Sequence, residues 1–477
     1  MIFRKLTLAF IFLLIAADTF AQGYEVEAEA NRWKDNRLAA FTFTFDDGFL
    51  SHYTNAFPIL ENFGFKGTFF VIPPSLTDTL PGIWRYGSWQ QFIEMSDSGH
   101  EIASHSMTHP HLTNLPLGDT LTPHTIEYEL YQSKIMIEQK IPGVKCISFA
   151  YPYSELNPLV RSITKKYYEN GRAVGLIPNL SVFPDSVFYK LNSKLIEFSL
   201  PRQKFDDDFD EYLEFTEWFG SMIDSSKWGI FMIHEVFPYD SIPWALNQGS
   251  YFPIANEWLI KAADFIRSKS DNDSVWVETM GNVTRYIRER NAFSYQVLSK
   301  EETFFTILPS DTLNDEIYNY PLTVDVSVPD EWDIVFFQQG NNFDTLTSFL
   351  KGETNYVRTD IIPDGGIAVF SNEALSSLDL ISAQPEEFLL YQNYPNPFNP
   401  VTRIKYSILS EENGELQPVK LVVYNALGEE IDVLVDEKQS AGIYEISFDG
   451  SDLPSGVFLY KLSVGKNYQT KKFILVK

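Results

Sequence analysis

Residues 41–48 read FTFTFDDG, and the fold of the chain is built outward from this stretch. The aromatic and β-branched run Phe41–Phe45 predicts a strand, and the Asp-Asp-Gly after it predicts a tight turn. About sixty residues later, residues 105–111 read HSMTHPH, so His105 and His109 stand four residues apart and can face one ion. Two His nitrogens and one carboxylate oxygen make a three-ligand metal site with a position open for water, and the second carboxylate is then free to act as a base.

Each motif alone has an ordinary explanation, because Asp-Asp-Gly is most often a solvated turn and a His-x-x-x-His pair is most often accidental. Here, however, His105 follows a strand-like run at residues 100–104, and a predicted helix ends before that run at Gly99. Both motifs therefore follow strands, and α/β barrels carry their catalytic residues at the C-terminal ends of strands. We interpret the pair as a catalytic metal centre.

Segments typical of strands and helices alternate from Leu38 to about Ala292, which predicts a parallel sheet closed or nearly closed into a barrel. Beyond Phe293 the helical periodicity vanishes, and runs such as residues 322–328 alternate apolar and polar side chains, as in half-exposed antiparallel strands. We predict an α/β chain with a barrel over residues 31–292 and two small all-β sandwich domains over residues 293–383 and 385–477. The middle domain is either a spacer or a carbohydrate-binding module.

Together with GTFFV at residues 67–71 and GHEI at residues 99–102, the two motifs resemble those of NodB-homology polysaccharide deacetylases, carbohydrate esterase family 4, over residues 31–290. The resemblance implies an irregular (β/α) barrel and a metal-dependent hydrolase that removes acetyl groups from a polysaccharide. It assigns the general base to Asp46. It assigns one divalent ion, zinc or else cobalt or nickel, to Asp47, His105 and His109.

Residues 149–153 read FAYPY and resemble the family's third motif, in which the backbone N–H of Tyr153 is the oxyanion donor. The motif normally carries an Arg where this chain has Ala150. Because adjacent strand ends lie at about 4.8 Å spacing, we expect Arg172, which opens the next predicted strand, to orient the base instead.

Residues 230–234 read IFMIH and resemble the last motif, which assigns the general acid to His234; a buried structural histidine is the alternative. Three aromatic residues, Tyr151, Trp84 and Tyr86, are expected to stack on sugar faces in the substrate site.

The two ends of the chain indicate export. Residues 391–400 read YQNYPNPFNP and, with NALG at residues 425–428 and SGV at residues 455–457, resemble the C-terminal sorting domain of bacterial type IX secretion cargo. At the other end, basic residues, a short apolar run and small residues before Gln22 predict a cleavable signal peptide over residues 1–21. The mature protein is therefore expected to be secreted or at the cell surface.

Composition limits the classes of molecule that this protein is expected to bind. A net charge of −27 argues against nucleic acid and anionic membranes, and no later stretch is apolar enough to predict a transmembrane segment. Acetylated polysaccharide and the type IX secretion machinery are the expected partners. Two alternatives stay open: an amidohydrolase acting on a small non-sugar C–N substrate, and a catalytically degenerate carbohydrate-binding surface protein, which Ala150 favours. The sequence leaves the polysaccharide, the choice between N- and O-deacetylation, the native metal and the oligomeric state undetermined.

Overall fold

The computed structural model describes residues 24–78, 85–175, 177–180, 185–195, 210–340, 342–373, 388–393, 396, 398–409, 416–425, 427–439 and 442–476. Two sequence-based predictions, the signal peptide at residues 1–21 and the sugar platform Trp84, lie outside these residues. The chain divides into two compact units. One contains Asn31–Asn291 together with Glu316–Thr323, and the other contains the β-rich remainder.

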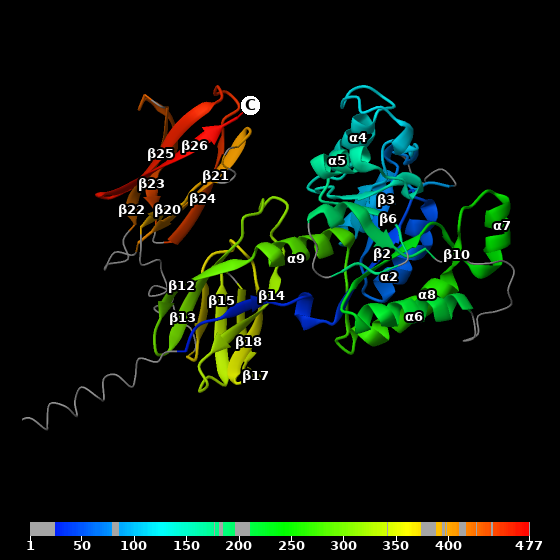
Figure 1. Cartoon of the computed structure of the whole chain (residues 1–477), viewed down its shortest axis with the longest axis horizontal. Coiled ribbons are helices and arrows are strands. Elements are labelled where there is room, and N and C mark those ends of the chain that lie inside the picture. Colours follow the sequence, from blue (N-terminus) through cyan, green and yellow to red (C-terminus); the bar gives the residue numbers. More distant parts are fainter. Residues whose placement is uncertain are drawn as a thin grey trace, which may run out of the picture. The chain divides into compact units, whose positions relative to one another are not determined.

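An eight-stranded parallel sheet forms the centre of the first unit (Figure 1). Seven strands follow the order β11-β2-β3-β4-β5-β6-β7, and the eighth, β8, also pairs with β2. Lys194, just past β7, forms a parallel bridge with Phe231 of β8 and closes the sheet into a barrel. The predicted irregular (β/α) barrel is therefore confirmed. The strands of this unit are β2 (Ala39–Phe45), β3 (Gly67–Val71), β4 (Glu101–Ser104), β5 (Ser148–Ala150), β6 (Asn170–Val174), β7 (Leu191–Ser193), β8 (Trp228–Ile233), β9 (Val236–Phe237), β10 (Ile254–Ala255) and β11 (Val275–Val277).

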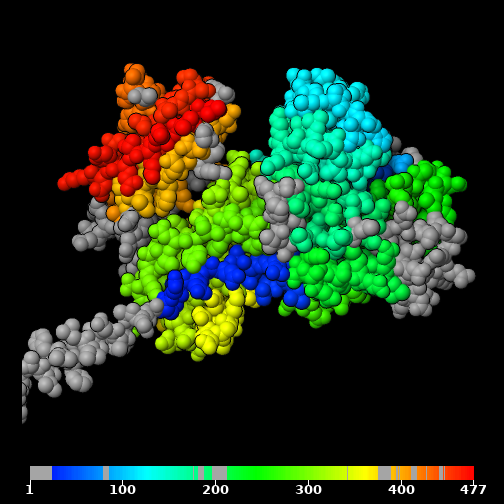
Figure 2. All heavy atoms as spheres, in the orientation of Figure 1, coloured from blue at the N-terminus to red at the C-terminus, as the bar shows by residue number. Residues whose placement is uncertain are grey.

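Helices follow most of these strands along the chain, as right-handed βαβ crossovers require. Their side chains form much of the surface of this unit in Figure 2, in cyan and green. The α-helices are α2 (Phe57–Asn62), α3 (Trp89–Asp97), α4 (Ile126–Lys140), α5 (Pro158–Tyr167), α6 (Asp210–Asp224), α7 (Ile242–Asn247), α8 (Asn256–Ser270) and α9 (Met280–Ala292). No helix among the described residues is long and apolar enough to cross a bilayer.

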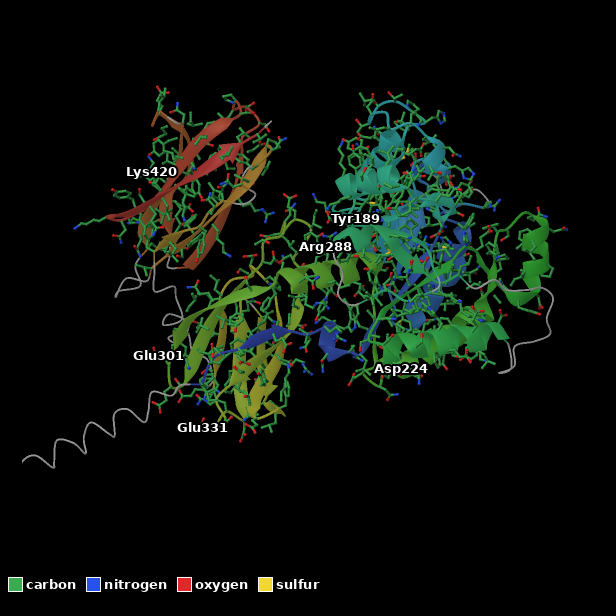
Figure 3. All side chains as sticks on the ribbon, viewed as in Figure 1. Tyr189, Asp224, Arg288, Glu301, Glu331 and Lys420 are labelled. Atoms are coloured by element: carbon green, nitrogen blue, oxygen red, sulfur yellow. The ribbon has the colours of Figure 1, made fainter. Side chains whose placement is uncertain are left out.

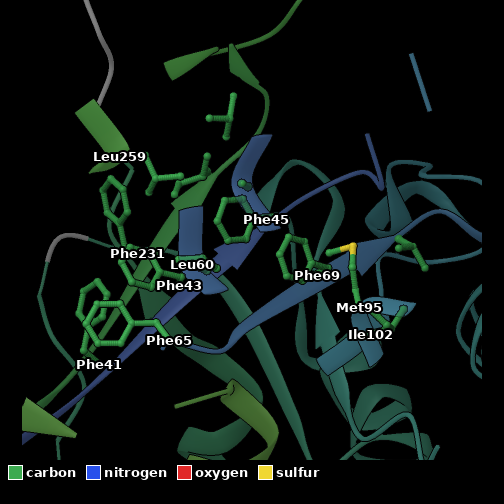
Figure 4. Close-up of a cluster of buried hydrophobic side chains, with 14 of the residues drawn as sticks. Phe41, Phe43, Phe45, Leu60, Phe65, Phe69, Met95, Ile102, Phe231 and Leu259 are labelled. Atoms are coloured by element: carbon green, nitrogen blue, oxygen red, sulfur yellow. The ribbon is translucent and has the colours of Figure 1, made fainter. Parts of the chain in front are cut away.

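Strand β2 explains how the sequence positions the site. Its phenylalanines alternate with threonines, so the two sets point to opposite faces. Phe41, Phe43 and Phe45 are fully buried and belong to the aromatic core of the unit (Figure 4). The hydroxyls of Thr42 and Thr44 donate to carbonyls of other strands or their ends, those of Glu278 and Phe231, at 2.8 and 3.0 Å. The same period of two places the next residue, Asp46, on the threonine face.

Arg288 is one of several α9 residues that contact the barrel. Arg288 donates to the hydroxyl of Tyr189 at 3.2 Å, and Figure 3 shows the two side chains next to each other. Tyr189 in turn accepts a hydrogen bond on its carbonyl from the hydroxyl of Tyr151 at 2.9 Å. This chain of contacts joins α9 to the segment after β5 that carries the third motif.

The second unit contains two antiparallel β-sandwiches, each built from two sheets. The first pairs the sheets β1-β14-β18-β17 and β12-β13-β19-β15-β16. The second pairs β20-β21-β24 and β23-β22-β25-β26. Their strands are β1 (Ala28–Ala30), β12 (Ser294–Lys300), β13 (Phe304–Ser310), β14 (Leu322–Val328), β15 (Ile334–Gln339), β16 (Asn342–Thr347), β17 (Phe349–Lys351), β18 (Thr354–Ile361), β19 (Ala368–Ser371), β20 (Leu389–Leu390), β21 (Val401–Ile408), β22 (Gln417–Asn425), β23 (Glu430–Gln439), β24 (Gly442–Asp449), β25 (Gly456–Val464) and β26 (Asn467–Leu475).

Strand β14 corrects one expectation from the sequence. Its alternating pattern predicts a half-exposed strand, but all of its residues are buried. The polar positions are satisfied inside the sandwich: Asp325 accepts a hydrogen bond from Arg358 at 2.7 Å, and Ser327 accepts one from the Glu27 amide at 2.7 Å. Strand β1, which the sequence reading did not assign to this domain, pairs with β14 and covers it.

Two buried histidines make the stability of the barrel sensitive to acid. Burial lowers the pKa values of His52 and His100 from 6.5 to about 4. Between pH 6.5 and 4 the unfolded chain binds protons at these sites that the folded chain does not. Above pH 6.5 these two histidines therefore do not reduce the free energy of unfolding. It falls as the pH drops toward 4, by at most about 1.4 kcal/mol per pH unit for each histidine.

We predict that His52→Gln flattens the fall in melting temperature between pH 6.5 and 4, measured by scanning calorimetry at several pH values. His124→Gln is the matched control, because His124 is exposed. Parallel losses of stability in the His52→Gln variant and the parent protein would contradict this assignment.

Candidate active site

The two sequence motifs meet at the C-terminal end of the barrel strands. Asp46 and Asp47 follow β2, while His105 and His109 follow β4. The His105 Nε2 atom lies 3.6 Å from Asp47 Oδ1 and 3.8 Å from Asp46 Oδ2, and the His109 Nε2 atom lies 3.7 Å from Asp47 Oδ1. One candidate ligand atom from each of Asp47, His105 and His109 lies within 4.8 Å of the others.

This triad fits a divalent metal. A tetrahedral ion bound at about 2.0–2.1 Å needs ligand atoms roughly 3.3 Å apart, and the two His–Asp47 separations of 3.6 and 3.7 Å are close to that spacing. The His105 Nδ1 atom hydrogen bonds to the Ala150 carbonyl at 2.9 Å. That contact makes Nδ1 the protonated nitrogen and leaves the Nε2 lone pair for a metal, as is usual for ligating histidines.

The protonation states of the triad also suit a cation. Burial lowers the pKa of His105 to about 3, so its imidazole is neutral at pH 7, the form that ligates. Burial also raises the pKa of Asp47 to about 7, and the nearby charges of Asp46 and Glu235 add to that rise. The site therefore holds more negative charge than its protein cations neutralise, which a divalent ion would correct.

A buried carboxylate holds the loop that carries the two histidines. Glu129 of α4 accepts a hydrogen bond from the Thr108 amide and another from the Thr108 hydroxyl, both at 2.7 Å. The loop needs this support because Ser106 and His109 have left-handed φ angles of 66° and 56°, which non-glycine residues rarely adopt. The sequence reading missed Glu129. The available signal was a glutamate on the buried face of α4, beside Ile126 and Leu130.

Asp46 is buried and paired with Arg172 of β6. The Arg172 Nη2 atom lies 2.6 Å from both Asp46 carboxylate oxygens, and Nη1 donates to Ser193 Oγ at 3.0 Å. Ala150 of β5 is the register partner of Arg172, so the guanidinium comes from the strand next to the one on which the family motif carries its Arg. Burial alone would raise the pKa of Asp46, but the charge of Arg172, with smaller contributions from His105 and His234, lowers it below its usual value.

Tyr153 lies in a short 3-10 turn after β5, at residues Pro152–Ser154. Its φ is 55°, and within the described residues its backbone N–H donates no hydrogen bond. Its side chain is 56 % exposed and stacks on the His111 ring at 4.0 Å, with His109 at 4.6 Å on edge. The ring therefore forms a wall directly beside a candidate metal ligand.

His234 follows β8 and is 8 % exposed. The rings of Tyr251 and Phe252 contact it, at centroid distances of 5.3 and 6.1 Å. Its carbonyl hydrogen bonds to His52 Nε2 at 2.6 Å, which fixes the backbone at this position. Burial lowers the pKa of His234, although the Asp46 charge opposes that shift. The sequence reading did not identify Tyr251.

The three expected sugar platforms have different environments. Tyr151 is 2 % exposed and its hydroxyl bonds to the Tyr189 carbonyl, so its ring lies in the core and cannot stack on a sugar. Tyr86 is half-buried and stacks on Phe49 at 5.4 Å. Trp84 is outside the described residues.

One further charged pair beside the site was not predicted. Arg85 Nη2 lies 3.9 Å from Glu235 Oε2, and the Glu235 side chain is 4 % exposed. Both charges act on Asp47, because Glu235 raises the pKa of Asp47 and Arg85 lowers it. The position of Glu235 directly after His234 was the only sequence signal for this pair.

Comparison with known proteins gives two family matches. The family described as polysaccharide deacetylase matches residues 34–168, and the secretion system C-terminal sorting domain matches residues 392–477. The first match contains Asp46, Asp47, His105, His109 and Tyr153.

Individual relatives match only parts of the chain. A gellan lyase from Bacillus sp. is 26% identical over 373 residues, covering 75% of this chain and 14% of that protein. A Bacillus subtilis (strain 168) protein with the name "Putative polysaccharide deacetylase YxkH" is 30% identical over 129 residues, covering 27% of this chain and 42% of that protein. The chain thus spans less than half the length of either relative.

Solved structures with partial similarity include BC0361, a polysaccharide deacetylase from Bacillus cereus. It is 26% identical with a TM-score of 0.27, covering 32% of this chain and 45% of that one. A family 4 carbohydrate esterase from Bacillus anthracis is 15% identical with a TM-score of 0.30, covering 57% and 92%. Residues 34–168 therefore carry a polysaccharide deacetylase (NodB-homology, carbohydrate esterase 4) domain, and residues 392–477 carry a secretion-system C-terminal sorting domain.

Proposed function

We propose that this protein is an exported, metal-dependent hydrolase that removes N-acetyl groups from a polysaccharide, with O-acetyl groups as a second class of substrate. The observation that carries the proposal is the convergence of Asp47, His105 and His109 around one point, beside the buried Asp46. Zinc is the proposed ion, because two imidazoles and one carboxylate are typical ligands of catalytic zinc. Cobalt or nickel would fit the same ligands.

Held by Asp47, His105 and His109, a divalent ion would supply Lewis acidity for polarising an acetyl carbonyl and for making water more acidic. The protein residues supply the rest. Asp46, kept ionised by Arg172, takes the proton of the attacking water. The Tyr153 N–H donates to the oxyanion of the tetrahedral intermediate, a contact typically worth about 3 kcal/mol. His234, when protonated, gives its proton to the leaving amine, without which the C–N bond breaks slowly.

Ala150 is the feature that favours a degenerate carbohydrate-binding protein over an enzyme. The contact of Arg172 Nη2 with both Asp46 oxygens weakens that alternative, since this carboxylate has a cation although the motif Arg is absent. A charge-assisted hydrogen bond of this kind is stronger than a neutral one and restrains the carboxylate. We therefore assign Arg172 the positioning role.

Export is part of the proposal. The match to a sorting domain at residues 392–477 supports passage through the type IX secretion machinery, and the predicted signal peptide would start that route. The proposed location is the cell surface or the surrounding medium, where acetylated polysaccharides are accessible.

We predict one divalent ion per chain in protein purified without chelator, measured by elemental mass spectrometry. His105→Ala should lose the ion because it removes one of three ligands. His111→Ala should retain it, since His111 hydrogen bonds to Glu155 and is not one of the triad. Equal metal content in the two variants would refute the assigned site.

Removal of Arg172 should lower kcat about 10²-fold with little change in KM, because the base loses its orientation. Loss of the positive charge also raises the pKa of Asp46, so the acidic limb of the pH–rate profile should move to higher pH. The informative set is Arg172→Ala, Arg172→Lys and the double variant Ala150→Arg with Arg172→Ala. We expect the double variant to recover part of kcat and of the pH profile. An unshifted acidic limb in Arg172→Ala would rule out the positioning role.

The activity itself is tested by acetate release from acetylated chito-oligosaccharides, acetylated xylan and peptidoglycan. We expect release from at least one, abolished by chelation and restored by zinc or cobalt. Asp46→Asn keeps the shape but removes the base, so the rate should fall by roughly 10²–10⁴. His234→Ala should impair amide substrates more than esters, because an alkoxide needs less help to leave. An unchanged rate in Asp46→Asn would refute the mechanism, and glycan binding without acetate release would favour the degenerate binding protein.

A further inference from the structure

A small cavity lies next to the metal triad but does not include it. Its volume is about 80 Å³, and its lining residues are Leu50, Ser51, Thr54, Arg85, Glu235, Phe237 and Trp244. These residues come from the segments that follow β2, β3 and β8, three strands that are adjacent in the barrel. The cavity is therefore on the catalytic end of the barrel.

The lining residues are close in sequence to the candidate site residues, and one backbone hydrogen bond joins two of the lining residues. The Leu50 amide donates to the Arg85 carbonyl at 2.9 Å, and Leu50 stands three residues after Asp47. Glu235 directly follows His234 in the chain. A group bound in the cavity would thus lie on the same end of the barrel as the acetyl group to be cleaved, and no lining residue is one of the candidate metal ligands.

The charged residues of the cavity have unused hydrogen-bonding capacity. Arg85 Nη2 donates to the Gly249 carbonyl at 3.0 Å, but within the described part of the chain the buried Arg85 Nε atom has no partner. Among the described residues, the side-chain contacts of Glu235 with Ser250 Oγ, the Tyr251 amide and Arg85 are made by Oε2. The cavity therefore offers a guanidinium donor and a carboxylate acceptor side by side, and an unsatisfied buried donor in a native structure needs an explanation.

An aromatic ring completes the cavity. Trp244 of α7 is 54 % exposed although it lines the cavity, and it contacts Phe237 edge-on at 6.4 Å. An exposed indole beside paired polar groups is a typical surface for a sugar, whose apolar ring face packs on an aromatic ring while its hydroxyls form hydrogen bonds. A free anion is disfavoured, because the Glu235 carboxylate lies 3.9 Å from the Arg85 guanidinium.

We propose that Arg85, Glu235 and Trp244 form a subsite for the sugar unit adjacent to the acetylated one in a polysaccharide chain. A hydroxyl is both donor and acceptor, so two neighbouring hydroxyls satisfy Glu235 and Arg85 together while the ring lies on Trp244. The proposal deepens the proposed function and rests on it for the position of the acetylated unit. Such a subsite implies a substrate of at least two linked neutral sugar units.

The test measures how binding affinity and kcat/KM change with the length of the oligosaccharide. Binding of the N-acetylglucosamine disaccharide and tetrasaccharide, and of acetylated xylotetraose, is measured by calorimetry in an Asp46→Asn background, which slows turnover. Trp244→Ala and Arg85→Gln should each weaken tetrasaccharide binding about tenfold, the effect of losing roughly 1.4 kcal/mol. Phe343→Ala, which removes an exposed ring 61 % accessible on β16, is the matched control and should bind as the parent does.

In the active protein, kcat/KM for acetate release should rise from disaccharide to tetrasaccharide, and Trp244→Ala should lose that rise. Release that is equally efficient at both lengths and in both proteins would overturn the subsite while leaving the proposed function intact. No release from any substrate, with tetrasaccharide binding still weakened by Trp244→Ala, would overturn the function and leave the subsite. No binding of any probe to the parent would overturn the subsite.

Discussion

The site depends on one buried ion pair. A carboxylate enclosed by protein is strongly disfavoured unless a cation and hydrogen bonds accompany it, and breaking such a pair typically costs about 3–5 kcal/mol. Asp46 meets this requirement through Arg172, which reaches it from β6 and is itself 1 % exposed, lying over the Phe70 ring and bonded to Ser193. The pair contributes to opposite pKa shifts in two adjacent carboxyl groups. The pKa of Asp46 is lowered, whereas that of Asp47 is raised to about 7 in the absence of a cation. Two carboxyl groups in one site can take different roles when their environments shift their pKa values in opposite directions.

Much of this arrangement could be predicted from the sequence because it follows from local patterns. The alternation along Phe41–Phe45 predicts the strand and also which face Asp46 occupies. The four-residue spacing of His105 and His109 predicts a shared ion. The absence of the motif Arg at Ala150, together with the spacing of adjacent strands, predicts Arg172 as its replacement. In each case the information lies in the identity of a few residues and in the regular geometry of strands.

The rest could not be predicted, because it depends on contacts between distant segments. Glu129 supports the histidine loop from a helix, and Arg85 meets Glu235 across two loops 150 residues apart in sequence. Tyr151 is an aromatic residue of the kind that stacks on sugars, but its hydroxyl donates to the Tyr189 carbonyl in the core. The sequence does not predict that contact. Strand β14 has the alternation of a half-exposed strand, yet β1 and charged partners bury it.

The register of Ala150 with Arg172 has a consequence for how such proteins are recognised. A functional group is required at a point in space, and two adjacent parallel strands can both deliver a long side chain to that point. Ala150 leaves the motif position without a cation, and Arg172 supplies one to Asp46 from the neighbouring strand. A motif can therefore be complete in space when one of its residues is missing from the sequence, because a side chain at the same level of the neighbouring strand takes its place.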